Sequence, residues 1–316
     1  MYRPEIKLLD CTIRDGGLIN NWQFSDELVR RVFEALVRSG VDYMEIGYKS
    51  SGKYFSREEN GKWKFCYDDD IKKIIDGVDT EMKLSAMADI GRVDYEDIPP
   101  KSESVLSMIR VACYVHQIDK AISLAHHCMD KGYETTINLM AVSKVLERDL
   151  DEALKDLAKS EVPTVYLVDS FGAMYSEQVQ SLAKKYLEAL PGKQIGIHTH
   201  NNQQLAFANT VEAIICGINR LDATIYGMGR GAGNCPLELL LAFLKNPKFD
   251  LRPILEVIQD IFIPLKAKVE WGYHIPYMIT GILNEHPRSG MKAMSEPELP
   301  DLRGFYEEMV SSEPLD

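Results

Sequence analysis

The chain has 316 residues, enough to bury a sizeable core within one large domain. Its 36 lysines and arginines against 48 aspartates and glutamates give a formal net charge of −12. An acidic surface repels phosphate backbones and anionic lipid heads, so nucleic acid and membrane are poor candidates for partners. The six cysteines form no Cys-x-x-Cys pair, and the sequence shows neither a signal peptide nor an apolar run of membrane length. We therefore expect a protein of the reducing cytoplasm.

Short apolar runs rich in β-branched residues alternate with amphipathic stretches along the chain. The expected strands are residues 6–13, 43–47, 82–87, 105–111, 135–140, 164–168, 194–198 and 220–225. The expected helices include residues 25–38, 117–131, 150–159, 176–190 and 205–216. Repeated strand–helix units predict a parallel sheet, and eight expected strands predict a closed (β/α)₈ TIM barrel. A doubly wound open sheet is the main alternative.

Two parts of the chain depart from this alternation. Residues 48–67 are too long and polar for a routine connection, and they follow the second strand at the end of the barrel where active sites lie. They are either a lid or a solvated insertion. Beyond Asn246 the pattern is helical only, over residues 250–268 and 275–285. We expect a catalytic barrel at residues 1–247 and a helical C-terminal extension at residues 248–316.

The end of the seventh expected strand carries two histidines. Side chains of a strand alternate between its faces, so His198 and His200 project the same way. Arg14 and Asp15 stand at the end of the first expected strand, before a glycine pair. In a closed barrel this brings Asp15 near both imidazoles. A carboxylate and two imidazoles suit a divalent metal, whereas the alternative is a local ion pair and two hydrogen-bonded histidines.

The loop after the eighth expected strand, Gly227 to Asn234, is rich in glycine and leads into a helix at Leu237. It is either an anion cradle at a helix N-terminus or a rigid turn that supports the metal site. A dinucleotide fingerprint is rejected, because that motif belongs to the first strand–helix turn of a Rossmann half. We expect no nucleotide cofactor.

Two further side chains are candidates because they end other strands. Glu45 ends the second strand and could reach the pocket, with a structural carboxylate as the alternative. Ser170 follows the sixth strand and could bind substrate or orient a ligand histidine. Together with Arg14, these are the candidate catalytic residues.

Four motifs in this order are similar to those of the metal-dependent pyruvate-aldolase group, typified by 4-hydroxy-2-oxovalerate aldolase, within the DRE-TIM metallolyase superfamily. This superfamily also contains 3-hydroxy-3-methylglutaryl-CoA lyase. The likeness spans about residues 5–245. The motifs are LLDCTIRDGG (8–17), DSFGAM (169–174), IGIHTHNN (195–202) and GMGRGAGNCPLE (227–238).

The resemblance implies a divalent metal, with Mn²⁺ or Mg²⁺ expected first and Zn²⁺ as an alternative. It implies that Arg14 stabilises an enolate oxygen and that Ser170 lines a pocket for pyruvate. The metal ligands that it implies are Asp15, His198 and His200, with Asn234 also approaching the metal.

One position departs from the aldolase pattern. Those aldolases carry a histidine three residues after the motif aspartate as the general base, and this chain has Leu18 there. Leucine cannot take a proton, so another group acts or the reaction differs. Glu45, Tyr48, Lys49 and metal-bound water are the substitutes considered. The aldolase tail that docks an aldehyde dehydrogenase also differs, so we do not assume that partner; a homo-oligomer is left open.

We expect a metal-dependent carbon–carbon lyase or aldolase that acts on a 2-oxo acid such as pyruvate, with an aldehyde as the other half. The first alternative is a synthase of the same superfamily that condenses an acyl-CoA with an oxo acid. The second is a non-catalytic barrel that binds a metal or a metabolite.

Overall fold

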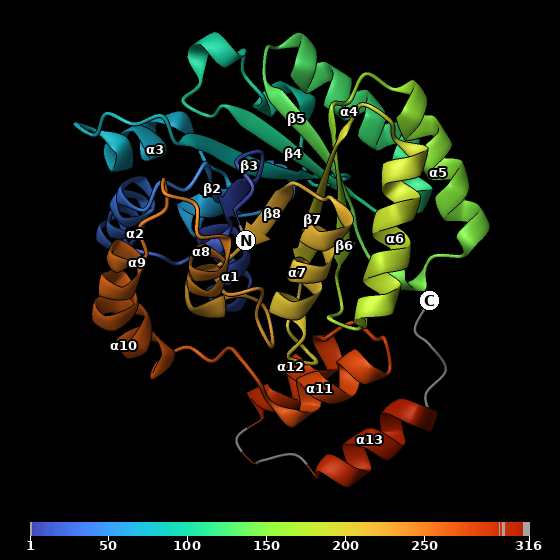
Figure 1. Ribbon diagram of the computed structural model, residues 1–316. Helices are drawn as coiled ribbons and strands as arrows, with labels where there is room; N and C mark the ends of the chain where they lie inside the picture. The colour runs from blue at the N-terminus through green and yellow to red at the C-terminus, as the bar shows by residue number, and fades with distance from the viewer. Residues whose placement is uncertain (1, 297, 299–300, 312–316) are drawn as a thin grey trace.

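The structure, a computed structural model, describes residues 2–296, 298 and 301–311. Eight parallel strands form a closed barrel in chain order, and β8 pairs with β1 to close it (Figure 1). The strands are β1 (Lys7–Asp10), β2 (Tyr43–Tyr48), β3 (Lys83–Asp89), β4 (Met108–Cys113), β5 (Glu134–Leu139), β6 (Thr164–Asp169), β7 (Gln194–Thr199) and β8 (Arg220–Ala223). The predicted (β/α)₈ barrel is confirmed, and the open sheet is excluded.

Helices surround the barrel and continue beyond it. The α-helices are α1 (Thr12–Asn20), α2 (Asp26–Arg38), α3 (Asp68–Ile75), α4 (Ile118–Asp130), α5 (Glu147–Lys159), α6 (Ser176–Ala189), α7 (Ala206–Cys216), α8 (Leu237–Leu244), α9 (Arg252–Val257), α10 (Ile263–Lys266), α11 (Ile275–Ile282), α12 (Arg288–Ser295) and α13 (Leu302–Ser311). Single 3₁₀ turns are η1 (Lys62–Lys64), η2 (Tyr95–Asp97), η3 (Lys101–Glu103), η4 (Val115–Gln117), η5 (Val142–Lys144) and η6 (Ile225–Gly227), and a π-helical turn, η7 (Ile258–Phe262), joins α9 to α10. Among the described residues, no helix has the length and apolar character that a membrane span requires.

Helix α2 shows how the sequence produces the outer layer. The Ser25 hydroxyl accepts a hydrogen bond from the Leu28 backbone N–H at 3.2 Å and so caps the first turn. Val29, Val32 and Leu36 recur at helical spacing and are completely buried. Each such side chain contributes roughly 1.5–3 kcal/mol when it leaves water. The amphipathic pattern therefore fixes both the helix and the face that packs on the barrel.

The interior of the barrel contains a layer of charged and aromatic side chains from the even-numbered strands. Glu45 on β2, Arg110 on β4, Tyr166 on β6 and Asp222 on β8 are all buried. Arg110 donates to the Glu45 carboxylate at 3.0 Å and to the Asp222 carboxylate at 2.6 Å. Its guanidinium also lies 4.4 Å from the centre of the Tyr166 ring. Alternate strands contribute the layers of such barrels, and here one layer is ionic instead of aliphatic.

The first strand is shorter than the sequence predicted, and this changes where Arg14 and Asp15 lie. The expectation of a strand over residues 6–13 is wrong at its end, because β1 stops at Asp10 and α1 begins at Thr12. The Asp10 carboxylate accepts hydrogen bonds from the Thr12 N–H at 3.1 Å and the Thr12 hydroxyl at 2.6 Å, which favours a turn at this point. Arg14 and Asp15 therefore project from the first turn of a helix.

Residues 48–67 divide into a buried and an exposed part. Trp63, Phe65 and Cys66 are completely buried, whereas most residues from 52 to 60 are partly or fully exposed. The second half of the segment thus belongs to the packed core. Helix α3, which the sequence reading did not include, follows directly.

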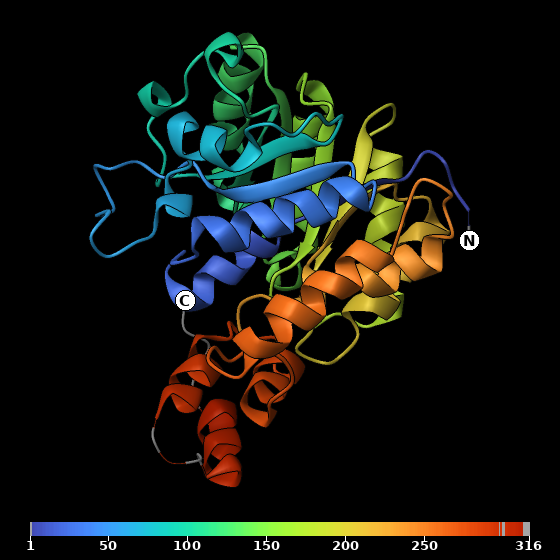
Figure 2. The same cartoon turned by 90° about the vertical axis from the view of Figure 1, so that its left-hand side faces the viewer.

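The C-terminal helices occupy two places. Helix α9 packs against α2 beside the barrel, as Figure 2 shows, and α11–α13 lie at one end of it. Hydrogen bonds hold that second group to loops at the C-terminal ends of the strands. Asn202 donates to the Tyr277 carbonyl at 3.1 Å, and the Ser143 hydroxyl donates to Asn284 at 2.7 Å. The C-terminal helices therefore cover part of the barrel mouth where the polar strand ends meet.

Candidate metal centre and active site

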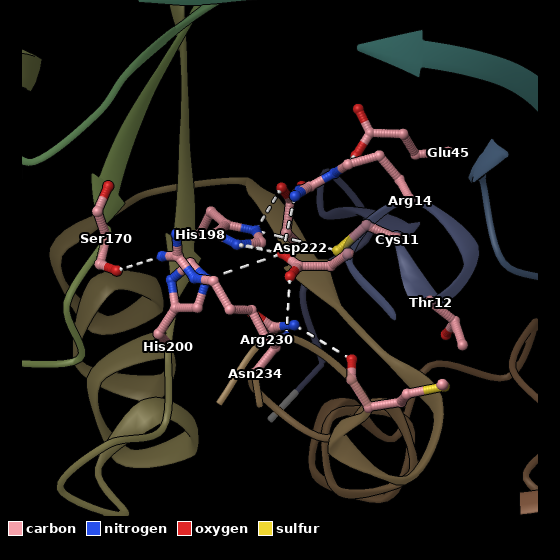
Figure 3. Close-up of polar contacts among 12 residues, drawn as sticks. Cys11, Thr12, Arg14, Glu45, Ser170, His198, His200, Asp222, Arg230 and Asn234 are labelled. Carbon is pink, nitrogen blue, oxygen red and sulfur yellow. Dashed lines mark hydrogen bonds and ion pairs between the residues drawn. The ribbon is translucent and has the colours of Figure 1, made fainter. Parts of the chain in front are cut away.

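Three side chains from two distant parts of the sequence, Asp15, His198 and His200, converge at the C-terminal mouth of the barrel. Figure 3 labels the two imidazoles, with Asp222 and Arg230 near them. The Nε2 atom of His198 lies 3.3 Å from Oδ2 of Asp15, and the Nε2 atom of His200 lies 3.8 Å from the same oxygen. All three residues are buried. The sequence predicted this meeting, and the structure brings these residues together.

Both histidines are oriented through their other ring nitrogen. Nδ1 of His198 lies 3.0 Å from the Asp222 carboxylate, and Nδ1 of His200 lies 3.0 Å from the Asp169 backbone carbonyl. When Nδ1 donates to an acceptor, the neutral imidazole presents the Nε2 lone pair, which is the usual arrangement of metal-binding histidines. The buried Nε2 atom of His198 has no hydrogen-bond partner among the described residues. A cation between the imidazoles and Asp15 would satisfy it.

Asn234 extends this group from the glycine-rich loop. It forms an antiparallel bridge with His200, and its side-chain N–H donates to the Met228 carbonyl at 3.2 Å. Its buried Oδ1 atom has no hydrogen-bond partner within the described chain. A Cβ at Gly229 would lie only 2.1 Å from the Asn234 amide nitrogen, so this close approach requires glycine. The loop therefore places Asn234 beside His200, with an amide oxygen that has no hydrogen-bond partner among the described residues.

Electrostatics also favours a cation here. Burial acts to raise the pKa of Asp15, but Arg14 and the two histidines outweigh it, so that pKa lies well below its ordinary value. Burial lowers the pKa of His200 well below its ordinary value, which keeps this imidazole neutral. Burial acts to lower the pKa of His198, but hydrogen bonds to Asp15 and Asp222 outweigh it and raise that pKa. One carboxylate, two imidazoles and an amide oxygen are donors that fit a divalent metal. The chain has an aspartate–histidine site that could hold such an ion.

A second group of potential ligands lies beside the first but suits a metal less well. It consists of Cys11, His198 and Asp222. Burial raises the pKa of Cys11 well above its ordinary value, so the thiol stays protonated, and it donates to the Ala223 carbonyl at 3.4 Å. A protonated thiol is a poor metal ligand. These residues therefore support the first group instead of forming a site of their own.

Arg14 connects the site to the ionic layer below it. Its Nε donates to Glu45 at 2.7 Å and its Nη1 donates to Asp15 at 2.7 Å. Glu45 is completely buried and is paired with both Arg14 and Arg110. Glu45 does not line the pocket, so the structure places it behind Arg14 instead of in contact with a ligand.

Two residues of this network were not singled out from the sequence. Asp222 accepts from Arg110 at 2.6 Å and lies 3.0 Å from His198, so it joins the ionic layer to the imidazole. Opposite charges from Arg110 and His198 overcome burial and lower the pKa of Asp222. The signal available was an acidic and a basic residue inside otherwise apolar expected strands. Burying such residues is costly unless they are paired.

A cavity of about 80 Å³ adjoins the three converging side chains. Ser170 lines it and accepts a hydrogen bond from the Ala141 N–H at 2.8 Å. Leu18 lines it too, so the position of the expected histidine faces the pocket with an apolar side chain. Of residues 48–67, Tyr48 is the one that lines it. The pocket is small enough to select a small molecule.

Arg230 and His286 also line this cavity, and the sequence reading singled out neither. Arg230 Nη1 lies 3.1 Å from Nε2 of His286, and Arg230 Nη2 donates to the Ser170 carbonyl at 2.9 Å. His286 comes from the connection between α11 and α12. The C-terminal helices therefore contribute to the wall of the pocket.

Comparisons with known proteins identify the family of this chain. A family model described as HMGL-like matches residues 5–261. An oxaloacetate decarboxylase of Mycobacterium tuberculosis is 31% identical over 245 residues, which cover 76% of this chain and 70% of that protein. A 4-hydroxy-2-oxovalerate aldolase of Thermus thermophilus is 31% identical over 270 residues, 82% of this chain and 75% of that protein.

Solved structures show the same architecture. The N-terminal domain of a proposed aldolase from Bacteroides vulgatus matches with a TM-score of 0.79 and 31% identity, over 92% of this chain and 97% of that one. The hydroxymethylglutaryl-CoA lyase of Pseudomonas aeruginosa matches with a TM-score of 0.64 and 16% identity, over 82% of this chain and 93% of that one. The latter likeness concerns the fold alone.

Proposed function

We propose, on the premise that this chain belongs to the HMGL-like family, that its site makes or breaks a carbon–carbon bond next to a 2-oxo acid such as pyruvate. The chain is a carbon–carbon lyase by its kinship with aldolases and a decarboxylase, and members of this family depend on divalent metals. The convergence of Asp15, His198 and His200 at the barrel mouth is the observation that carries the proposal.

The proposed ligands of the metal are Asp15, His198 and His200, with Asn234 offering its carbonyl oxygen. Carboxylate, amide oxygen and imidazole donors suit Mn²⁺ or Mg²⁺ first, with Zn²⁺ as the alternative. When bound, the cation would act as a Lewis acid toward the 2-oxo group. Asp222 and the Asp169 carbonyl hold the two imidazoles in place for this purpose.

Arg14 is the proposed donor to negative charge that develops on the substrate. Two of its nitrogens are bound to Glu45 and Asp15, while the residue also lines the pocket. The two carboxylates hold the guanidinium rigid, so its remaining nitrogen can donate to an enolate oxygen without reorganisation. Glu45 is thus a positioning residue, and Ser170 shapes the wall that receives the 2-oxo acid.

The substitutes considered for the histidine missing at Leu18 differ in their surroundings. Glu45 is held by two arginines, and the Lys49 ammonium donates to the Cys66 carbonyl at 3.1 Å. Burial raises the pKa of Tyr48 far above its ordinary value, so its hydroxyl can donate but does not accept a proton as phenolate. Solvent water within the pocket is therefore the proposed proton acceptor for a substrate hydroxyl.

A second candidate reaction is decarboxylation of a 2-oxo acid. Leu18 favours it, because loss of CO₂ requires no base for a substrate hydroxyl. The likeness to an oxaloacetate decarboxylase points the same way. In this reaction Arg14 would again donate to the enolate that remains.

The test is exchange of the C3 protons of pyruvate in D₂O, followed by mass spectrometry. We expect exchange with added Mn²⁺ or Mg²⁺, loss of exchange after treatment with EDTA, and recovery when the metal is returned. Exchange without any CoA thioester separates this function from an acyl-CoA-condensing synthase. If none of Mn²⁺, Mg²⁺ and Zn²⁺ supports exchange, the proposal is wrong.

A further inference from the structure

We propose that Arg230 binds an anionic group on the second substrate, so that the aldehyde joined to pyruvate carries a carboxylate or a phosphate. This inference rests on the proposed function, because it concerns the same pocket. The inference specifies the chemical class of the aldehyde that reacts with the 2-oxo acid in that pocket.

The first step is the contrast between Arg230 and the two arginines of the ionic network, Arg14 and Arg110. Arg14 and Arg110 are each held by two carboxylates, at distances from 2.6 to 3.0 Å. The guanidinium of Arg230 forms no salt bridge among the described residues, although it lines the same pocket. Asp15 is the carboxylate that acts on it most strongly, and Asp15 is already paired with Arg14. Its hydrogen bonds go to the Ser170 carbonyl and to His286, and its buried Nε atom has no partner there.

The second step concerns the charge of these contacts. A carbonyl is neutral, and burial together with Arg230 lowers the pKa of His286 to about 3, so the imidazole is neutral as well. Arg230 is half-buried, so a guanidinium that is partly removed from water gains from an anion that accepts its hydrogen bonds. The same two contacts hold it in one orientation at the pocket wall. A pre-positioned guanidinium whose hydrogen-bond partners are neutral is suited to carboxylate or phosphate, which its planar fork can bind through two hydrogen bonds.

The third step places this anion within the reaction. Asp15, His198 and His200 line the same cavity and are the groups proposed to receive the 2-oxo acid. Arg230 is held between Ser170, after β6, and His286 of the C-terminal helices. Its partner therefore approaches from the side of the C-terminal helices, where the second substrate would lie.

The fourth step asks whether the anion leaves or stays. An arginine bound to a carboxylate stabilises its charge, and CO₂ is neutral, so Arg230 would oppose the loss of the carboxylate that it holds. The anionic group is therefore one that the aldehyde keeps. In the condensation, pyruvate C3 loses a proton to water, a bond forms between C3 and the aldehyde carbon, and the aldehyde oxygen takes up a proton. The reverse reaction restores both substrates.

The experiment compares two aldehydes of equal length, glyoxylate and acetaldehyde, in condensation with pyruvate. They differ by a carboxylate against a methyl group. We expect the native protein to prefer glyoxylate in kcat/KM by roughly 10- to 100-fold, the effect of one charge-assisted pair. Arg230→Gln should abolish most of this preference through the KM for glyoxylate, and Arg230→Lys should restore part of it.

Arg148→Gln is the matched control, since this arginine is 78% exposed in its side chain. It should keep the native preference, and thermal melting checks that each variant is folded. Pyruvate exchange separates the two proposals, because its absence contradicts the proposed function itself. Exchange with equal use of the two aldehydes, with use of neither, or with a preference that survives in Arg230→Gln overturns only the role of Arg230.

Discussion

The two mouths of this barrel are opposites in size and in chemistry. The N-terminal mouth opens into a cavity of about 930 Å³, whereas the C-terminal mouth encloses about 80 Å³. At the N-terminal mouth, Lys7 and Lys248 pair with Asp42, and Lys83 pairs with Glu134. These side chains are partly exposed, so solvent screens their charges. The large cavity is thus open to solvent, and its positive and negative side chains are paired with one another.

Most polar side chains at the C-terminal mouth are buried, and some of their atoms have no hydrogen-bond partner among the described residues. Both groups of potential metal ligands found in the described residues lie there. Buried polar atoms without a hydrogen-bond partner occur at both mouths of the barrel, for example Nε of Arg220 at the N-terminal mouth. That atom is a hydrogen-bond donor, and a donor does not attract a cation. At the C-terminal mouth, the narrow one, the atoms without a partner include Nε2 of His198 and Oδ1 of Asn234, each of which can offer a lone pair. Hydrogen-bond acceptors that converge and lack partners therefore identify the functional mouth of the barrel better than the volume of the cavity does.

The largest effect is expected when one of the proposed metal ligands is removed from the C-terminal mouth. His200→Ala should lower bound metal to a small fraction of one ion per chain and reduce pyruvate exchange by about 10³-fold or more, because the proposed Lewis acid is lost. Metal content after dialysis and the exchange rate are the measurements. His126→Ala is the control, because this half-buried histidine of α4 accepts from the Glu161 N–H at 3.4 Å and does not line the pocket. Unchanged metal content in His200→Ala would remove this residue from the site.

Arg14 tests whether binding of the metal and stabilisation of charge are separate tasks. Arg14→Gln should retain the metal but lower turnover by about 10²-fold, as loss of a pre-organised donor does. The measurements are metal stoichiometry and kcat for pyruvate exchange. Arg14→Lys should recover little, because an ammonium cannot bridge Glu45 and Asp15 as the guanidinium does. Normal turnover in Arg14→Gln would exclude Arg14 from the mechanism.

How much the sequence could predict follows from the kind of signal each feature carries. Repeated apolar strands and amphipathic helices predicted the closed barrel, since both periodicities are local. His198 and His200 could be paired because alternation within one strand fixes their direction. Asp15 was predicted to lie near them, yet on a strand. A single turn formed by Asp10 and Thr12 places it on a helix instead.

The side chains that hydrogen-bond to the site residues could not be predicted from local sequence patterns. Asp222 and Arg110 are 112 positions apart in the sequence, and only the closed barrel makes them neighbours. Arg230 stood inside a motif whose glycines drew attention to backbone conformation. That its hydrogen-bond partners are a carbonyl and an imidazole, and not a carboxylate, becomes evident only in the folded structure. Polar contacts between residues far apart in the sequence were therefore not predictable from the sequence alone.

Asp222 offers a finer test of the narrow mouth, because it touches His198 and not the proposed ion. Asp222→Asn should weaken metal affinity by about 10- to 100-fold while a saturating metal concentration restores most exchange. Isothermal titration with Mn²⁺ measures the affinity, and thermal melting checks the fold. A residue that only stabilised the barrel would lower the melting temperature without moving the affinity. Native affinity in a folded variant would contradict the orienting role.

The smallest effect is expected at the wide mouth. Glu134 is 41% exposed in its side chain, where it pairs with Lys83 and accepts from the Tyr43 hydroxyl at 2.9 Å. Exposed pairs of this kind contribute roughly 0–1 kcal/mol, so Glu134→Gln should change the free energy of unfolding by less than about 1 kcal/mol. Urea unfolding measures this, and pyruvate exchange should stay within about twofold of the native rate. A tenfold loss of exchange in a stable variant would mean that the wide mouth takes part in the reaction, since nothing in the pairing of Glu134 connects it to the narrow one.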